Sequence, residues 1–499
     1  MKKKFIIPKD LTFGDLSREL KKYCRAADLE FARSAYDFAA KAHKGQTRLN
    51  KEPYIIHPLS SAYILAQMRI DVHIIAAALL HDVPEDTGVT LEEIEKKFGK
   101  DIAGIVGGIT KLGKLKYRGA ERYLENLRKM FVAMAEDIRV MIIKFADRAH
   151  NLMTLAPQPP NKQYRIALES LEIYAPIANR LGMGEFKGLL EELSFPYVFP
   201  KEFEKTKSMR DNFISGEAPY LEKVIEKARE ELNANDIKVL DAHGRKKQLY
   251  SLFKKLQQKN WETDKIHDIV AIRIVVPDLN DCYAALGIIH KLWRPLKGRI
   301  KDYISQPKPN GYKSLHTTVF CEKGKVVEFQ IRTQEMHEEA EYGVSAHWHY
   351  DEKGKISKKP AKDIGWAQEL AKVQKEVLNK MSDLEELKID FFQNRIFVFT
   401  PNGDVIDLPE NGTAVDFAYH IHSEIGNKCS GVRVNDQMVS LDTPLKNGDV
   451  VDIIVDQNRK GPNPDWLKFV KTAAARSHIK AAMNAKKRGW LESLLPLGK

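Results

Sequence analysis

The chain has 499 residues, of which 43% are hydrophobic and 30% charged, and it carries a formal net charge of +12. This length exceeds what one ordinary core holds, so we expect two to four domains, and the composition excludes a disordered or fibrous protein. The positive charge favours a polyanionic partner such as a nucleotide, RNA or an acidic protein, but a basic surface that serves only solubility is an equal alternative.

The sequence also argues against membrane-spanning and disulfide-stabilised classes. It contains no run of about 18 apolar residues, the length that a spanning helix needs. The apolar run before Pro8 in MKKKFIIPKDLTFGD is too short for the core of a signal peptide. The four cysteines are scattered and form no CxxC pair. We therefore expect a cytoplasmic protein with reduced thiols.

The N-terminal part of the chain has a helical pattern. From Leu16 to Leu193, apolar residues recur at three- and four-residue spacing, which predicts an all-α domain over residues 1–196. The stretch SFPYVFP at 194–200 breaks this pattern with two prolines and several aromatic residues. We expect the domain to end there.

Strand patterns follow and alternate with helical ones. The segments IKVLDAHG, DIVAIRIVV and HTTVFCEKGKVVEFQIRT predict a mixed α/β domain over residues 197–350. A helical linker is expected over 351–390, beginning with the Lys-rich DEKGKISKKPAKD. Short strands, an Asn-Gly turn and a helix from Val415 predict a small β-grasp-like domain over 391–457. The remainder, 458–499, predicts a basic helical stub too small to be a domain.

Two histidines and two aspartates lie where apolar helices of the first domain turn polar. His57 is in YIIHP, His81 and Asp82 end HIIAAALLHD, and Asp147 ends the apolar run in VMIIKFADR. Such ligands can converge on one divalent cation and leave room for water. A cation of this kind activates water and neutralises phosphate charge, so the set predicts hydrolysis of a phosphate or pyrophosphate ester. Singly, each histidine is more typical of a packed or capping residue.

The segments HKGQTRLNKEPYIIHP, LLHDVPEDT and KFADRAHNLMTL resemble the hydrolase motifs of the RelA/SpoT (Rsh) family. In that family an HD-type domain uses Mn²⁺ to release pyrophosphate from the 3′ position of (p)ppGpp. The resemblance implies that the two histidines and two aspartates are the metal ligands, and that Glu85 and Asp86 activate the water. It assigns substrate contacts to Arg48, Tyr54, Asn151 and Thr154.

Three residues depart from the family pattern near these motifs. On a continuous helix Asp82, Glu85 and Asp86 would share one face. Pro84 interrupts this segment where an aliphatic residue is usual, and proline cannot continue a helix without losing a hydrogen bond. Leu49 and Met153 stand where basic residues are usual. Neither is a metal ligand, so we expect altered substrate binding rather than lost chemistry.

A second set of residues predicts a nucleotide site. In HGRKKQLYSLFKKLQ, residues two apart in an extended segment share a face, which groups Arg245 with Lys247. Residues four apart in the following helix also share a face, which groups Ser251 with Lys255. The segment GRIKDYISQPKPNGYKSLHTTV places three further cations beside Tyr312: Arg299, Lys301 and Lys308. Cations for phosphates and an aromatic face for a base predict nucleotide binding. An exposed basic loop with a core tyrosine is the alternative.

Two carboxylates accompany these cations. Asp268 opens the strand DIVAIRIVV, and Glu328 shares a strand face with Gln330 and Arg332 through the period of two. Mg²⁺ bound to a triphosphate is a suitable partner for such carboxylates. For Asp268 alone, an ion pair with Arg273 at a strand edge is the alternative.

From Gly244 to Trp348 these segments are similar to the synthetase domain of the Rsh family, which has a nucleotidyltransferase-like fold. The resemblance implies that Asp268 and Glu328 serve Mg²⁺, that Tyr312 stacks on guanine, and that the ribose 3′-OH attacks the β-phosphate of ATP. Glu328 would accept its proton as AMP leaves. The Arg299-Ile300-Lys301-Asp302 motif matches the RxKD form of bifunctional members. Implied nucleotide contacts are Arg245, Lys247, Ser251, Lys255, Arg273, Arg299, Lys301, Lys308, Asn310, Tyr312, His316 and Gln330.

The segment from RIFVFTPNGDV to NGDVVDIIV resembles the TGS domain of long Rsh proteins. In the family this domain helps to sense uncharged tRNA on the ribosome, and His420 or His422 would face the tRNA acceptor end. Asn427 departs from the pattern, which has a histidine there, and a solvated histidine pair is the alternative. The further regulatory domains of long members do not follow, and whether the chain is truncated or naturally short stays open.

Together these features predict a bifunctional enzyme of the stringent response. It would use ATP and GDP or GTP to make (p)ppGpp with Mg²⁺, and would hydrolyse (p)ppGpp with Mn²⁺. A tRNA- or ribosome-binding regulator with weak catalytic sites, and a hydrolase of another nucleotide, are the alternatives. Since opposed activities would cycle ATP uselessly, we expect mutual exclusion through the helices between Asn151 and Tyr220.

Overall fold

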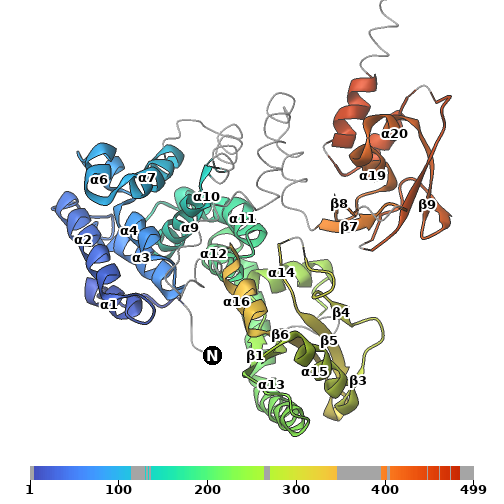
Figure 1. Ribbon diagram of the computed structural model, residues 1–499, viewed down its shortest axis with the longest axis horizontal. Coiled ribbons are helices and arrows are strands. Elements are labelled where there is room, and N and C mark those ends of the chain that lie inside the picture. Colours follow the sequence, from blue (N-terminus) through green and yellow to red (C-terminus); the bar gives the residue numbers. More distant parts are fainter. Residues whose placement is uncertain are drawn as a thin grey trace, which may run out of the picture. The chain divides into compact units, whose positions relative to one another are not determined.

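The computed structural model describes residues 5–113, 130, 133, 136–262, 270–308, 310–344, 395–401, 405–446, 448–459, 461–472 and 474–483. The chain divides into two compact units, residues 1–372 and 373–499, and each is described by itself (Figure 1). The expected linker over 351–390 and the end of the basic stub, 484–499, lie outside the described residues. Within the described ranges, no helix has the length and apolarity needed to cross a membrane.

The N-terminal part of the first unit is helical, as expected (Figure 1). Helices α3, α4 and α9 pack against one another, and their apolar residues are buried. Helix α10 is followed by one π-helical turn, η1 (Ser170–Tyr174), before α11. The bounds are α1 (Phe13–Leu20), α2 (Ala26–Ala42), α3 (Ile56–Gln67), α4 (Val72–Leu80), α5 (Val83–Asp86), α6 (Leu91–Phe98), α7 (Lys100–Gly113), α9 (Ile138–Met153), α10 (Pro160–Glu169), α11 (Ala175–Arg180) and α12 (Gly184–Val198).

The helix is interrupted near Pro84, and the chain starts a new helical turn there. Helix α4 ends at Leu80, and Asp82 precedes the short helix α5. Pro84 lies in the first turn of α5, where its missing N–H costs no helical hydrogen bond. The carbonyl of Asp82 accepts from the N–H of Glu85 at 3.1 Å and of Asp86 at 2.9 Å. Pro84 is therefore accommodated, and the three carboxylates stay within one turn.

The interruption of helical structure expected at residues 194–200 is shorter than the sequence pattern indicates. Helix α12 continues through Pro196 to Val198, and α13 (Pro200–Ala234) begins after the single non-helical residue Phe199. The aromatic side chains of this stretch pack against α14 (Leu249–Gln258), for example Phe195 against Phe253 with ring centroids 5.1 Å apart. These residues therefore join the helical part to the α/β part.

The α/β part is built on one mixed sheet with strand order β1-β2-β6-β5-β3, and β4 pairs with β5 (Figure 1). Strands β2 and β6 are parallel, and the other pairs are antiparallel. One face is apolar and buries its side chains with α13 and α15 (Leu279–Leu292). The strands are β1 (Asp241–Lys246), β2 (Val270–Val276), β3 (Arg294–Pro295), β4 (Lys301–Asp302), β5 (Leu315–Phe320) and β6 (Val326–Thr333), with α16 (Gln334–Tyr342) after them.

The second unit contains the strands and helix that the sequence pattern predicts. Its core lies between α19 and the strands. The segment after the last strand packs on the same helix: Trp466 and Val470 are buried with Val415 and Tyr419. The described elements are β7 (Arg395–Phe399), β8 (Val405–Pro409), α19 (Ala414–Ile421), α20 (Ser423–Lys428), β9 (Cys429–Val434), β10 (Gln437–Val439), β11 (Val451–Val455) and the short helix η6 (Pro464–Lys468).

Candidate active sites

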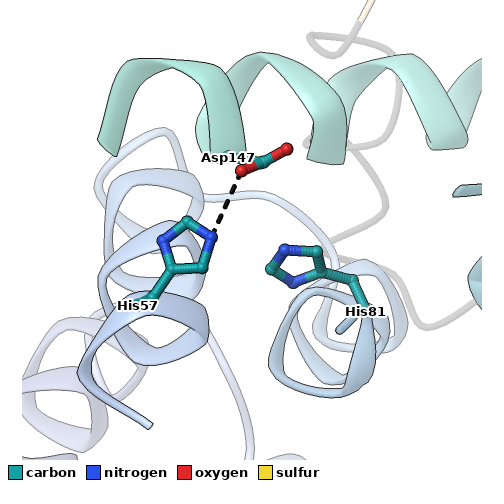
Figure 2. Close-up of side chains that lie close together, drawn as sticks. All are labelled: His57, His81 and Asp147. Atoms are coloured by element: carbon teal, nitrogen blue, oxygen red, sulfur yellow. Dashed lines mark ion pairs between the residues drawn. The ribbon is translucent and has the colours of Figure 1, made fainter. Parts of the chain in front are cut away.

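The first candidate site lies where three helices of the all-α part meet. His57 is in the first turn of α3, His81 follows the end of α4, and Asp147 lies on α9. All three side chains are buried, and one possible ligand atom from each lies within 4.8 Å of the others. Figure 2 shows the two imidazole rings and the carboxylate turned toward one another from these elements. Two imidazoles and a carboxylate suit a divalent cation.

Hydrogen bonding behind the His81 ring decides which of its nitrogens faces the site. His81 Nδ1 lies 2.7 Å from Ala78 O, and since a carbonyl only accepts, Nδ1 carries the proton. In the neutral ring Nε2 then presents a lone pair. This buried atom makes no hydrogen bond within the described structure and lies 3.1 Å from Asp82 Oδ1.

The same reasoning applies to His57. Its Nδ1 lies 2.7 Å from His150 Nδ1, an atom that also faces Arg48 Nη1 at 3.3 Å. A guanidinium only donates, so His150 Nδ1 accepts and His57 Nδ1 donates. His57 Nε2 therefore presents a lone pair toward Asp147 Oδ1 at 3.2 Å and Asp82 Oδ2 at 3.4 Å.

These lone pairs indicate that the site fits a cation. Burial lowers the pKa of His57, although Asp147 and Asp82 oppose the shift, so the ring favours its neutral form. A neutral nitrogen lone pair facing a carboxylate oxygen is repulsive unless a positive ion lies between them. All four residues predicted as metal ligands, including Asp82, meet at this point.

Asp147 is held by a lysine that the sequence analysis did not single out. Lys144 Nζ lies 2.6 Å from Asp147 Oδ2, one turn away on α9. Burial raises the pKa of Asp147, but the Lys144 ammonium and His57 outweigh it and hold the pKa well below its ordinary value. The carboxylate is therefore ionised, with Oδ1 turned to His57 and Oδ2 engaged by Lys144.

The Tyr54 hydroxyl contacts both the group of candidate metal ligands and one of the two predicted water-activating carboxylates. Its hydroxyl donates to Asp82 Oδ2 at 3.1 Å and also to Asp86. Glu85 and Asp86 are exposed at the rim of the cluster. Desolvation, reinforced by Asp82 and Asp86 against the opposing charge of Lys144, raises the pKa of Glu85.

Arg48 brings the predicted substrate-contact residues together. Its guanidinium donates to Asn151 Oδ1 at 2.6 Å and to Thr154 Oγ1 at 3.3 Å. Of the three residues near these motifs that depart from the family pattern, Leu49 is 67% exposed and Met153 is partly buried. The change at residue 49 therefore places an apolar side chain at the surface beside Arg48.

The second candidate site lies on the polar face of the mixed sheet. Strand register sets a row of residues across four strands: Arg273 lies opposite Gln330, Gln330 opposite His316, and His316 opposite Lys301. In the neighbouring row Ala271 separates Arg245 from Glu328. The period of two along each strand turns these side chains away from the apolar core.

Glu328 sits among polar partners on this face. Its Oε1 accepts from Gln330 Nε2 at 2.8 Å, and His316 Nδ1 lies 3.5 Å from the same oxygen. The other ring nitrogen of His316, Nε2, is 2.8 Å from the hydroxyl of Tyr312. Burial and the nearby cations, chiefly Lys308, lower the pKa of His316, which keeps this ring neutral.

The loop before β5 supplies the aromatic and cationic groups. Lys308 Nζ lies over the rings of Tyr303 and Tyr312, 4.6 and 5.1 Å from their centroids. Although much of the residue is exposed, desolvation of this ammonium, with the charges of Lys301 and Arg245, lowers the pKa of Lys308 to about 8. Lys308 therefore lies against Tyr312, and the charges of Lys301 and Arg245 act on it.

Some predicted nucleotide contacts have other partners. Ser251 bonds to Lys187 at 3.2 Å and Glu191 at 3.3 Å on α12. Arg273 pairs with Glu341 on α16 at 2.7 Å. Arg299 is exposed before β4, and Lys247 and Lys255 are partly buried. Asp268 lies outside the described residues, so its placement stays a prediction.

For three residues at these sites the sequence predicted no functional role: Lys144, His150 and Arg332. The first two fall inside the motif KFADRAHNLMTL, at spacings of three from Asp147, which places them on its helix face. Arg332 is fully buried, its Cζ is 5.6 Å from the Tyr312 ring centroid, and its guanidinium has no hydrogen-bond partner in the described residues. The shared strand face with Glu328 was its only sequence signal.

In the second unit both predicted histidines are exposed. His420 lies in the last turn of α19, and His422 Nδ1 accepts from the N–H of Glu424 at 3.2 Å. Asn427, the departure from the family pattern, accepts from the Tyr419 hydroxyl at 2.9 Å. The asparagine therefore has a local structural partner.

The all-α part thus holds a candidate cation site, and the α/β part holds a sheet face with cationic and aromatic side chains. Three families match: the HD domain over residues 35–184, the region found in RelA / SpoT proteins over 244–355, and the TGS domain over 396–455. The chain belongs to the RelA/SpoT family. The predicted combination of folds is confirmed.

Curated relatives match nearly the whole chain. It is 46% identical over 95% of its length to the guanosine-3′,5′-bis(diphosphate) 3′-pyrophosphohydrolase of Aquifex aeolicus, covering 67% of that protein. It is 43% identical to the GTP pyrophosphokinase of Myxococcus xanthus, covering 62% of it. It is 42% identical to the bifunctional (p)ppGpp synthase/hydrolase SpoT of Escherichia coli, covering 68%. The chain thus spans about two thirds of the length of these relatives.

Proposed function

We propose that this chain is a bifunctional alarmone enzyme that makes (p)ppGpp from ATP and GDP or GTP, and hydrolyses (p)ppGpp to pyrophosphate and GDP or GTP. The single observation that carries the proposal is the cluster of His57, His81 and Asp147 in the same chain as the cationic face around Tyr312 and Glu328. The relatives' names, which include both a synthase and a hydrolase, support it. We place the enzyme in the cytoplasm.

In the hydrolase site, His57, His81, Asp82 and Asp147 would hold Mn²⁺. When bound, this cation supplies an activated water and neutralises charge on the 3′-pyrophosphate. Glu85, whose pKa is raised, and Asp86 take up and return the proton at the rim of the cluster. Asn151 and Thr154 orient Arg48 toward the substrate, and Tyr54 holds the carboxylates of Asp82 and Asp86 in place.

In the synthetase site, Tyr312 offers its ring to guanine, and Lys308, Lys301 and Arg245 face the phosphates. Glu328, held by Gln330, accepts the proton of the ribose 3′-OH as that oxygen bonds to the β-phosphate of ATP and AMP leaves. Glu328 and Asp268 would serve Mg²⁺, which neutralises triphosphate charge when bound. Positioning and charge neutralisation carry most of this chemistry.

We also propose the domain limits of the sequence analysis: 1–196 for the hydrolase, 197–350 for the synthetase, 351–390 for the linker, 391–457 for the TGS-like domain and 458–499 for the basic stub. The exposed histidines His420 and His422 support a further partner of this module, uncharged tRNA on the ribosome. If the chain were only a binding regulator, it would form no AMP from ATP and GDP.

The test is a paired assay on the purified chain. Synthesis is measured as AMP release from ATP and GDP with Mg²⁺ alone, and hydrolysis as pyrophosphate release from ppGpp with Mn²⁺. We expect both activities in the wild type, with His57→Ala losing only hydrolysis and Glu328→Gln only synthesis. Absence of either activity in the wild type would contradict that half of the proposal.

A further inference from the structure

A second layer of side chains surrounds the proposed metal ligands. His150 lies on α9, three residues after Asp147, and is 4% exposed. Its Nδ1 is 2.7 Å from Nδ1 of His57, and the two rings are 4.9 Å apart between centroids. No role is predicted for this histidine from the sequence, and the proposed mechanism does not use it.

The contacts of His150 belong to a chain of hydrogen bonds that runs from His57 through Arg48 and Asn151 to Asp147. Arg48 Nη1 faces His150 Nδ1 at 3.3 Å, and Arg48 Nη2 donates to Asn151 Oδ1 at 2.6 Å. Asn151 in turn donates to Asp147 Oδ1, the oxygen that lies 3.2 Å from His57 Nε2. These hydrogen bonds link Arg48, the proposed substrate contact, to the proposed metal ligands His57 and Asp147.

Because the Arg48 guanidinium only donates, Nδ1 of His150 is the acceptor between Arg48 and His57. It thereby keeps the proton of His57 on Nδ1 and leaves the Nε2 lone pair facing the carboxylates. Partners behind a ligating histidine orient its ring and set its tautomer, and their loss typically weakens metal binding by about 10–100-fold.

We infer that His150 is a positioning residue of the hydrolase site, which fixes the ring orientation and tautomer of His57 for a divalent cation and braces Arg48. This inference rests on the proposed hydrolase function and adds a residue to it. A buried histidine that only fills space is the competing explanation. The two differ in one property, since space filling does not depend on an acceptor at the position of Nδ1.

A matched pair of substitutions separates these explanations. Asn and Leu have nearly the same shape, but only Asn places a hydrogen-bond acceptor close to the position of Nδ1. The readout is Mn²⁺ binding to the full chain without nucleotide, measured by calorimetry and by the rise in Tm that the metal causes. AMP formation from ATP and GDP by each variant checks that the remainder of the chain is folded.

We expect His150→Leu to weaken Mn²⁺ binding by about 10-fold or more and His150→Asn to remain within about 3-fold of the wild type. Equal Mn²⁺ affinity in the wild type and His150→Leu would overturn the inference. Equal weakening in both variants, with a lower Tm before metal is added, would assign His150 a packing role and overturn it as well. If the wild type itself bound no Mn²⁺, the proposed hydrolase function would fail first, and the inference with it.

Discussion

Asn310 Nδ2 donates a hydrogen bond of 3.1 Å to the carbonyl of Asn179, so the loop that carries Tyr312 is tied directly to α11 of the all-α part. Beside this contact the two backbones approach closely. The N–H of Val344 donates to Leu181 O at 3.0 Å, and a Cβ added to Gly343 would lie 2.2 Å from that same oxygen. The all-α part and the α/β part, which hold the two proposed sites, therefore meet in a tight contact at their boundary.

Gly343→Ala tests whether this boundary couples the sites. We expect a nonhydrolysable ATP analogue with GDP to lower the hydrolysis rate of the wild type, and this effect to shrink severalfold in the variant because the added methyl group forces the backbones apart. Measurement of ppGpp hydrolysis with and without the analogue gives the coupling directly. Gly324→Ala is the matched control: its φ of +71° resembles +58° at Gly343, but no atom lies within 4 Å of its added Cβ. Equal loss of coupling in both variants would exclude the boundary as its route.

Removal of the Tyr54 hydroxyl should slow hydrolysis. Tyr54→Phe keeps the ring but deletes two hydrogen bonds to carboxylates, on Asp82 and Asp86. A hydrogen bond to a charged group contributes about 1.5–3 kcal/mol, so we expect kcat for ppGpp hydrolysis to fall roughly 10- to 100-fold. The synthesis rate of the same preparation should not change. An unaltered kcat would show that these two bonds play no part in the reaction.

Glu328→Gln should remove the proposed proton acceptor of the synthetase without changing the shape of the site. General-base catalysis typically contributes about 10²–10⁴-fold, so AMP formation should fall by that range. Hydrolysis of ppGpp should remain within about twofold of the wild type because the other site is intact. Glu335→Gln, an exposed carboxylate on the nearby α16, serves as control. Synthesis that survives in Glu328→Gln would require another base.

Synthesis should decline at alkaline pH through Lys308. Its pKa is lowered to about 8 by desolvation and by Lys301 and Arg245, so the ammonium loses its proton as the pH rises through that value. The neutral amine attracts phosphate less, and kcat/KM for GDP should fall above about pH 8, since this ratio reports on the free enzyme. Lys308→Arg keeps its charge and should move the decline to higher pH by at least about one unit. A decline at the same pH in both proteins would assign it to another group.

Metal binding should stabilise the chain through Asp147. A ligand that binds only the folded state adds about 2.7 kcal/mol at a hundredfold excess over its Kd, so Mn²⁺ should raise the Tm of the wild type and EDTA should reverse the rise. Asp147→Asn should lose this response. Its Tm without metal should also be lower, because the partly buried Lys144 loses its ion-pair partner. Glu95→Gln, an exposed change on α6, should respond as the wild type does. A full Mn²⁺ response in Asp147→Asn would contradict the ligand assignment.

Sequence patterns predicted best those features that depend on interactions between residues close together in the chain. The three- and four-residue spacing of apolar residues predicts the helices of the first unit, and the alternation in VVEFQIRT predicts which side chains of β6 leave the core. The same patterns predict an interruption at Pro84 and a break at 194–200, and the structure has a new helical turn at the first and a single non-helical residue, Phe199, at the second. A proline is harmless in a first helical turn, and aromatic residues that interrupt a helical pattern can be packing contacts, as Phe195 and Phe253 are.

The sequence by itself determined the chemical types at both sites and their order along the chain, because motif spacing and hydrophobic period are properties of short segments. Only the tertiary structure decided the partners: His57 meets His150 across 93 residues, and Arg273 meets Glu341 across 68. No periodic pattern records such a pair, since the distance depends on how whole helices and strands pack. That packing sets the tautomer of His57 and the charge around Tyr312, and with them the chemistry that each site can perform.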